Sequence, residues 1–244
     1  LPGQMAMLVG KDYCAHPQVC FGAIGDCFDG SVAPLQVGQF ESGNEMDDAF
    51  ASMLIERNGG GTRQESYEMA LYYFAHHAKM DCLEKRGEKG YMFIIGDEAA
   101  YPTARRSEIE KHIGDKVQGD VSIETIVADA LEKFEVFFLI PSGTNNYHNA
   151  SIRDFWVRLL GAERVIKIPE PTAVCETIAT TIGLMEGAVD AAGIHADLAG
   201  IGASTATIGA VAHATDALAR STSLARVGTG DLPARTTASS AARL

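Results

Sequence analysis

Three short runs of almost purely apolar residues, each bounded by turn-forming or charged residues, constrain this fold most. They cover residues 91–95 (YMFII), 136–140 (VFFLI) and 165–168 (VIKI). Consecutive apolar positions are typical of strands that are covered on both faces, as in a parallel sheet. The sequence therefore predicts a buried sheet with helices packed against it.

Helical patterns lie between and after these runs. We expect helices over residues 63–82, 123–134 and 152–160, and a further helix that Thr172 caps. The first has an apolar stripe, and the last has core positions at Val174, Ile178, Ile182 and Met185. This alternation predicts an α/β fold with a doubly wound, mostly parallel sheet.

The N-terminal part is expected to add a buried strand over residues 19–25 and an edge strand over residues 35–40. A helix should follow from Asn44 or Asp47 to Asn58. Residues 1–187 then form the α/β domain. Residues 188–244 form an extension rich in Ala, Gly, Ser and Thr, with a helix over 205–219 and a disordered end.

The charge distribution restricts the class of partner. The formal net charge is -12, and residues 188–244 hold equal numbers of acidic and basic residues, so the acidic excess lies in residues 1–187. Such a body repels a phosphate backbone, which argues against nucleic acid and favours divalent cations or a basic protein surface. The five cysteines are an odd number without a CxxC pair, and we expect reduced thiols in a cytoplasmic protein without a membrane span.

Candidate functional residues collect where the predicted strands end, since the carboxyl ends of parallel strands meet at one edge. Asp26 ends the first strand, and Asp97 and Glu98 follow residues 91–95. A glycine-rich loop, Gly59-Gly60-Gly61-Thr62, precedes the long predicted helix. This order resembles the metal-ion-dependent adhesion site of von Willebrand factor type A (VWA) domains.

The resemblance implies a VWA-like fold in which Thr62 and Asp97 bind or orient Mg²⁺, with Asp26 and Glu98 as weaker candidates. The family's Asp-x-Ser-x-Ser motif, at the end of its first strand, has no equivalent here. Residues 29–33 (DGSVA) are interpreted as a turn, and Leu1 falls within the expected first helix. Either the first strand lies outside this chain, or this member does not bind metal.

Four more residues are predicted to line the rim that contacts a partner. Glu41 and Ser42 end the edge strand, and Ser142 and His148 follow the strand at residues 136–140. We interpret the adjacent His76 and His77 as surface or partly buried residues and not as metal ligands, because neighbours on a helix cannot both face one metal.

The sequence thus favours a non-catalytic module that binds other protein subunits, with Mg²⁺ involved through a partial adhesion site. By family analogy, the partners include AAA+ ATPase systems. One alternative is an α/β hydrolase-type enzyme that uses Cys27 or Asp26, for which His148 is the histidine expected on the same rim. Another is a structural subunit of a large complex, with a vestigial metal site.

Overall fold

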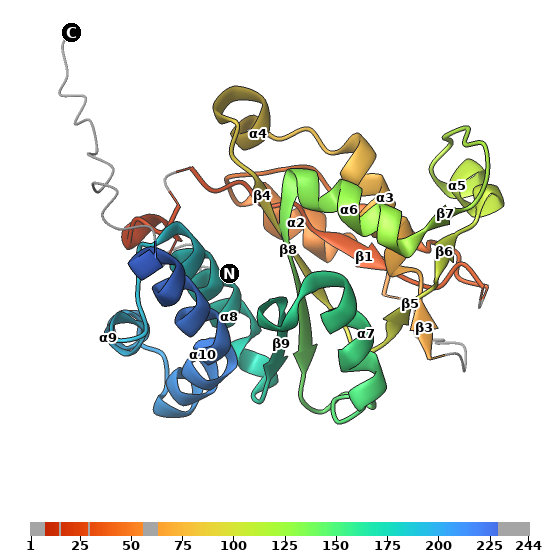
Figure 1. The fold of residues 1–244 in the computed structure, drawn as a ribbon. Coiled ribbons are helices and arrows are strands. Elements are labelled where there is room, and N and C mark those ends of the chain that lie inside the picture. Colours follow the sequence, from red (N-terminus) through yellow and green to blue (C-terminus); the bar gives the residue numbers. More distant parts are fainter. Residues whose placement is uncertain (1–7, 15, 29, 56–62, 229–244) are drawn as a thin grey trace, which may run out of the picture.

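The computed structural model describes residues 8–14, 16–28, 30–55 and 63–228, and it is a mixed α/β fold (Figure 1). Its main sheet has three parallel strands in the order β4-β8-β9. These strands are β4 (Gly90–Ile95), β8 (Phe134–Pro141) and β9 (Val165–Ile168). They coincide with the three apolar runs, so the predicted parallel sheet is confirmed at its centre.

Helices cover both faces of this sheet because β8 sends alternate side chains to two separate cores. Val136, Phe138 and Ile140 join the core under α3 (Tyr67–His77), α6 (Ile123–Lys133) and α7 (Ala150–Leu160). Phe137 and Leu139 join the core under α8 (Val174–Glu186), α9 (Gly193–Gly200) and α10 (Thr205–Gly228). Figure 1 shows α8, α9 and α10 gathered together on one side of β9.

Six short strands pair outside the main sheet. β1 and β2 form an antiparallel hairpin, β3 and β5 pair in parallel, and β6 and β7 are antiparallel. Their bounds are β1 Gly22–Ile24, β2 Leu35–Val37, β3 Gln64–Glu65, β5 Ala99–Ala100, β6 Thr103–Ala104 and β7 Val121–Ser122. Among the described residues no strand ladder joins β1 to β4, so the expectation that residues 19–25 belong to the parallel sheet is wrong.

The long helix expected over residues 63–82 is divided into shorter elements. Gln64 and Glu65 pair with Ala99 and Ala100, so the helix α3 begins only at Tyr67. It ends at His77, because Ala78 has an extended backbone, and α4 (Asp81–Arg86) follows.

The remaining helices are α2 (Glu45–Ala51), α5 (Arg106–His112) and the 3-10 turns η1 (Ala162–Arg164) and η2 (Pro171–Ala173). Thr172 therefore lies within η2, where its backbone N–H is bonded by the Glu170 side chain, and it does not cap α8.

The residues after position 187 share a core with the sheet. Leu198 of α9 and Val211 and Leu218 of α10 are at most 3% exposed and pack with Ile166 and Ile168 of β9. The last helix extends to Gly228, beyond the expected end at Ala219. The rest of the segment predicted to be disordered, residues 229–244, lies outside the described residues.

The N-terminal segment packs onto the same core. The Tyr13 side chain is 2% exposed, its hydroxyl donates to Asp197 of α9 (2.7 Å), and Lys11 pairs with the same carboxylate (3.0 Å). A Cβ at Gly183 of α8 would lie 2.6 Å from the Tyr13 ring, so this close approach requires glycine.

In the described part of the chain, no helix combines the length and apolarity that a membrane span requires.

Candidate functional site

The end of β1 is held in place by Asp26, whose side chain is 2% exposed. Oδ1 accepts hydrogen bonds from the Phe28 backbone N–H (3.0 Å) and the Ser66 hydroxyl (3.2 Å). Oδ2 accepts one from the Tyr101 hydroxyl (2.8 Å). These donors come from three different segments, so Asp26 joins the β1 hairpin to the start of α3 and to the loop after β5.

Glu68, in the first turn of α3, is another buried acid of this region and is 1% exposed. One carboxylate oxygen accepts the Tyr101 backbone N–H (3.1 Å). The pKa of Glu68 is raised to about 8, mainly by burial and in smaller part by the nearby charges of Asp26 and Glu65, while backbone hydrogen bonds oppose the shift. The carboxyl group is therefore mostly protonated at neutral pH.

Asp97 and Glu98 follow β4 and are both half-buried. The Asn146 backbone N–H donates to Oδ2 of Asp97 (2.9 Å), which connects the loop after β8 to the end of β4. The pKa of Glu98 is raised, mainly by burial and then by the charge of Asp97, while a hydrogen bond with Glu65 opposes the shift. In the described structure neither Asp97 nor Glu98 has an ion pair with a lysine or arginine.

These acids form one continuous feature, which we call the carboxylate edge. It consists of Asp26, Glu65, Glu68, Asp97 and Glu98. Gly96 lets the chain turn into this edge, because a Cβ at that position would overlap with the Tyr67 hydroxyl. The Trp156 indole N–H also donates to the Glu98 carbonyl oxygen (2.9 Å), so α7 holds the same turn in position. The structure thus brings Asp26, Asp97 and Glu98 into one region.

The Mg²⁺ ligands implied by the family resemblance are only partly present in this part of the chain. Thr62, together with Gly59, Gly60 and Gly61, lies outside the described residues. Asp97 offers the hard oxygen ligand that Mg²⁺ prefers. However, the described carboxylates of this edge do not include three whose oxygens lie within 4.8 Å of one another. The described residues alone therefore do not fit a closed Mg²⁺ site.

The predicted partner-binding rim is divided between two places. Ser142 and His148 lie in the loop after β8, which also provides Asn146. The Ser142 hydroxyl donates to the Pro169 carbonyl oxygen (2.7 Å), while His148 is exposed and its ring packs edge-on against Tyr147.

Glu41 and Ser42 do not share this rim. Glu41 exchanges two backbone hydrogen bonds with Val19, at the beginning of the segment that leads into β1. Because β1 and β2 are antiparallel, the end of β2 lies near the start of β1, roughly 20 Å along the chain from Asp26. The structure therefore places Glu41 at the other end of the hairpin from Asp26, and the role of Glu41 and Ser42 in partner binding stays a prediction.

Sequence reasoning missed Glu65, Glu68, Tyr101 and Asn146. A signal existed for Glu68, because it lies next to Tyr67 and one turn before Leu71 and Tyr72, on a helix whose positions 67–72 are all buried. For Tyr101 and Asn146 no local pattern predicts the contact, since each depends on where two distant loops meet.

Cys27 has a histidine near it, but it is not His148. The structure instead groups Cys27 with Glu108 and His112 of α5. The pKa of the Cys27 thiol is raised to about 11, mainly by burial, while a hydrogen bond with Ser66 opposes the shift and the charges of Glu68 and Glu108 add to it. The thiol is consequently protonated at neutral pH, which does not correspond to an activated nucleophile.

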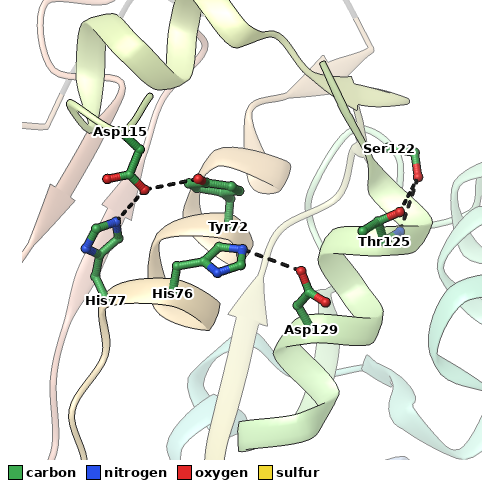
Figure 2. A network of polar contacts seen from close by, with 7 residues as sticks. All are labelled: Tyr72, His76, His77, Asp115, Ser122, Thr125 and Asp129. Carbon is green, nitrogen blue, oxygen red and sulfur yellow. Dashed lines mark hydrogen bonds and ion pairs between the residues drawn. The ribbon is translucent and has the colours of Figure 1, made fainter. Parts of the chain in front are cut away.

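Figure 2 shows that His76 and His77 point to two different partners. Nε2 of His76 lies 3.5 Å from Asp129 of α6, and Nε2 of His77 lies 2.8 Å from Asp115 in the loop after α5. The Tyr72 hydroxyl also donates to Asp115 (3.0 Å). The end of α3 is thereby connected to two neighbouring segments, and both histidines are on the surface, as predicted.

In comparisons with known proteins, no protein-family model, no curated protein and no solved structure matches this chain.

Proposed function

We propose that this chain is a non-catalytic binding module that assembles with other protein subunits through its carboxylate edge. The observation that carries the proposal is that Asp97 and Glu98, at the end of β4, have no ion pair with a lysine or arginine of the described chain. Partly buried carboxylates that repel one another favour a positive group from outside. A basic side chain of a partner provides such a group.

A second form of the proposal includes Mg²⁺. In it, Asp97 and Thr62 hold the ion as the VWA resemblance implies, and a carboxylate of the partner completes its coordination. A doubly wound, VWA-like arrangement belongs to this form, and the parallel order of β4, β8 and β9 with helices on both faces supports it. A cytoplasmic subunit of a larger complex, with an AAA+ ATPase among its partners, is the biological setting that this resemblance suggests.

The alternative function, an enzyme that uses Cys27 or Asp26, has weaker support. Both carboxylate oxygens of Asp26 accept hydrogen bonds that join distant segments, which suits a structural role. The raised pKa of Cys27 suits a protonated thiol.

The binding proposal is tested by comparing the proteins that co-purify with two tagged variants from the native host. Asp97→Asn with Glu98→Gln neutralises the two acids of the edge that follow β4, with little change in shape. Glu132→Gln with Asp154→Asn makes the same change in net charge on exposed positions of α6 and α7. We expect the control to retain the wild-type partners at unchanged stoichiometry and the edge variant to lose them. Equal retention by both variants contradicts the proposal.

The same proteins distinguish the two forms of the proposal. If Mg²⁺ bridges the partner, EDTA releases the complex, excess Mg²⁺ restores it, and Mg²⁺ raises the melting temperature of the isolated wild type but not of the edge variant. If a basic side chain binds directly, EDTA has no effect and the complex weakens as the salt concentration increases.

A further inference from the structure

A separate cluster of potential metal ligands lies where the end of β1 meets α5. Glu108 and His112 are one helical turn apart on α5, and Oε2 of Glu108 lies 3.1 Å from Nε2 of His112. Cys27 follows β1 and reaches the same point from the hairpin. One ligand atom from each of these three residues lies within 4.8 Å of those from the other two.

The donor set indicates which metal would bind. A thiolate, an imidazole and a carboxylate together suit Zn²⁺, whereas Mg²⁺ prefers oxygen ligands only. Ligand atoms around tetrahedral Zn²⁺ are about 3.5 Å apart, so small side-chain rotations would bring the three atoms to bonding positions. The side chains of Glu108 and His112 are each 17% exposed, so an ion can reach them from solvent.

Surrounding contacts already hold the two segments in position. The Cys27 backbone N–H donates to the Ser66 hydroxyl (2.9 Å), which in turn donates to Asp26. On the other side, Ile109 of α5 is 0% exposed and anchors the helix in the core. The Arg105 guanidinium also lies over the Phe28 ring, 4.4 Å from its centre. Such supporting contacts orient metal ligands before the ion binds.

We propose that Cys27, Glu108 and His112 form a Zn²⁺ site with a fourth coordination position for water. The site links the β1–β2 hairpin, which has no strand ladder to the main sheet in the described structure, to α5. A Glu–His pair one turn apart is by itself an ordinary helix contact, but the thiol from a segment distant in sequence completes a ligand set. The inference does not depend on the proposed function, because it involves other residues and a different metal.

The test uses the full chain, freed of metal with a chelator and titrated with Zn²⁺ against a chromophoric competitor. We expect one Zn²⁺ per chain, no displacement by millimolar Mg²⁺, and thiolate-to-metal charge-transfer absorption when Co²⁺ replaces Zn²⁺. Cys27→Ser and His112→Gln should each weaken binding by at least about 100-fold.

Matched controls separate this site from adventitious binding by other thiols and imidazoles. Cys20→Ser changes another half-buried thiol of the same hairpin, and His77→Gln changes an exposed histidine. Both should bind Zn²⁺ like the wild type. Zn²⁺ should also protect Cys27, but not Cys20, from alkylation as read by peptide mass spectrometry.

Two results would overturn the proposal. One is the absence of stoichiometric Zn²⁺ binding by the wild type, and the other is equal weakening by the Cys27 and Cys20 variants. Circular dichroism of each metal-free variant shows whether it is folded. If Cys27→Ser does not fold, Glu108→Gln provides the same comparison, because it keeps the shape of the side chain.

Discussion

At the scale of single residues, Glu68 shows how the fold places an acid where its charge is unfavourable. Its side chain is 1% exposed, and Asp26 and Glu65 are close enough to raise its pKa further. A carboxyl group with a pKa of about 8 retains its proton in the folded state at neutral pH and releases it on unfolding. The stability of the protein must then depend on pH through this residue.

The direction of that dependence follows from the two pKa values. Between about pH 4.5 and pH 8 the folded state holds one more proton than the unfolded state, so stability decreases as the pH rises through this window, by at most about 1.4 kcal/mol per pH unit. The substitution Glu68→Gln removes this dependence. In denaturant unfolding, we expect the variant to gain stability relative to the wild type from pH 5 to pH 8, to the order of 3 kcal/mol.

The control for this prediction is Glu132→Gln on the exposed side of α6. It should follow the wild-type pH profile. If the unfolding free energies of wild type and Glu68→Gln change with pH in parallel, Glu68 is ionised in the folded state, and the prediction is wrong.

At the scale of elements, α8 packs its core face with threonines. The sequence pattern predicts core positions at Val174, Ile178, Ile182 and Met185. All four pack in or against the core, but only Ile182 is buried, and the other three are half-buried. The buried face instead includes Thr177, Thr180 and Thr181, each 0% exposed. The helix contacts both α10 and Tyr13, and small side chains allow this close packing.

The hydroxyl groups of these threonines differ in their hydrogen bonding. Thr177 donates to the Ala173 carbonyl oxygen (2.7 Å), whereas the buried hydroxyl of Thr180 has no hydrogen-bond partner among the described residues. We expect Thr180→Val to raise the unfolding free energy by about 1 kcal/mol, because an unsatisfied polar group is removed. Thr177→Val should lower it by about 1 kcal/mol, because a hydrogen bond is lost. Urea unfolding of the two variants measures both changes in free energy. Equal destabilisation would contradict the difference in hydrogen bonding between Thr177 and Thr180.

At the scale of the whole molecule, the Ala- and Gly-rich segment after residue 187 completes the second core. Val211 and Leu218 of α10 are at most 3% exposed and pack with Phe137, Leu139 and Ile166 of the sheet. Without this helix, the core that covers this face of β9 would lose part of its packing. We therefore expect residues 8–228 to unfold as one unit.

Two leucines on the same helix test this. Leu218 is 3% exposed and Leu224 is 72% exposed. Leu218→Ala should lower the unfolding free energy by about 2–4 kcal/mol, and Leu224→Ala by less than about 0.5 kcal/mol. In the Leu218 variant, the unfolding transition followed by Trp156 fluorescence, which reports on the opposite core, should coincide with the transition followed by circular dichroism. Two separate transitions would show that α10 unfolds independently.

The amino-acid sequence was enough to predict the strands of the main sheet, because burial on both faces leaves a continuous apolar run that needs no knowledge of neighbours. It also placed Asp97 and Glu98 at a strand end. Two features are visible only in the folded chain: antiparallel pairing carries Glu41 away from that edge, and His112 lies near Cys27. Such contacts depend on strand direction and on the packing of segments far apart in the chain, which local periodicity does not encode.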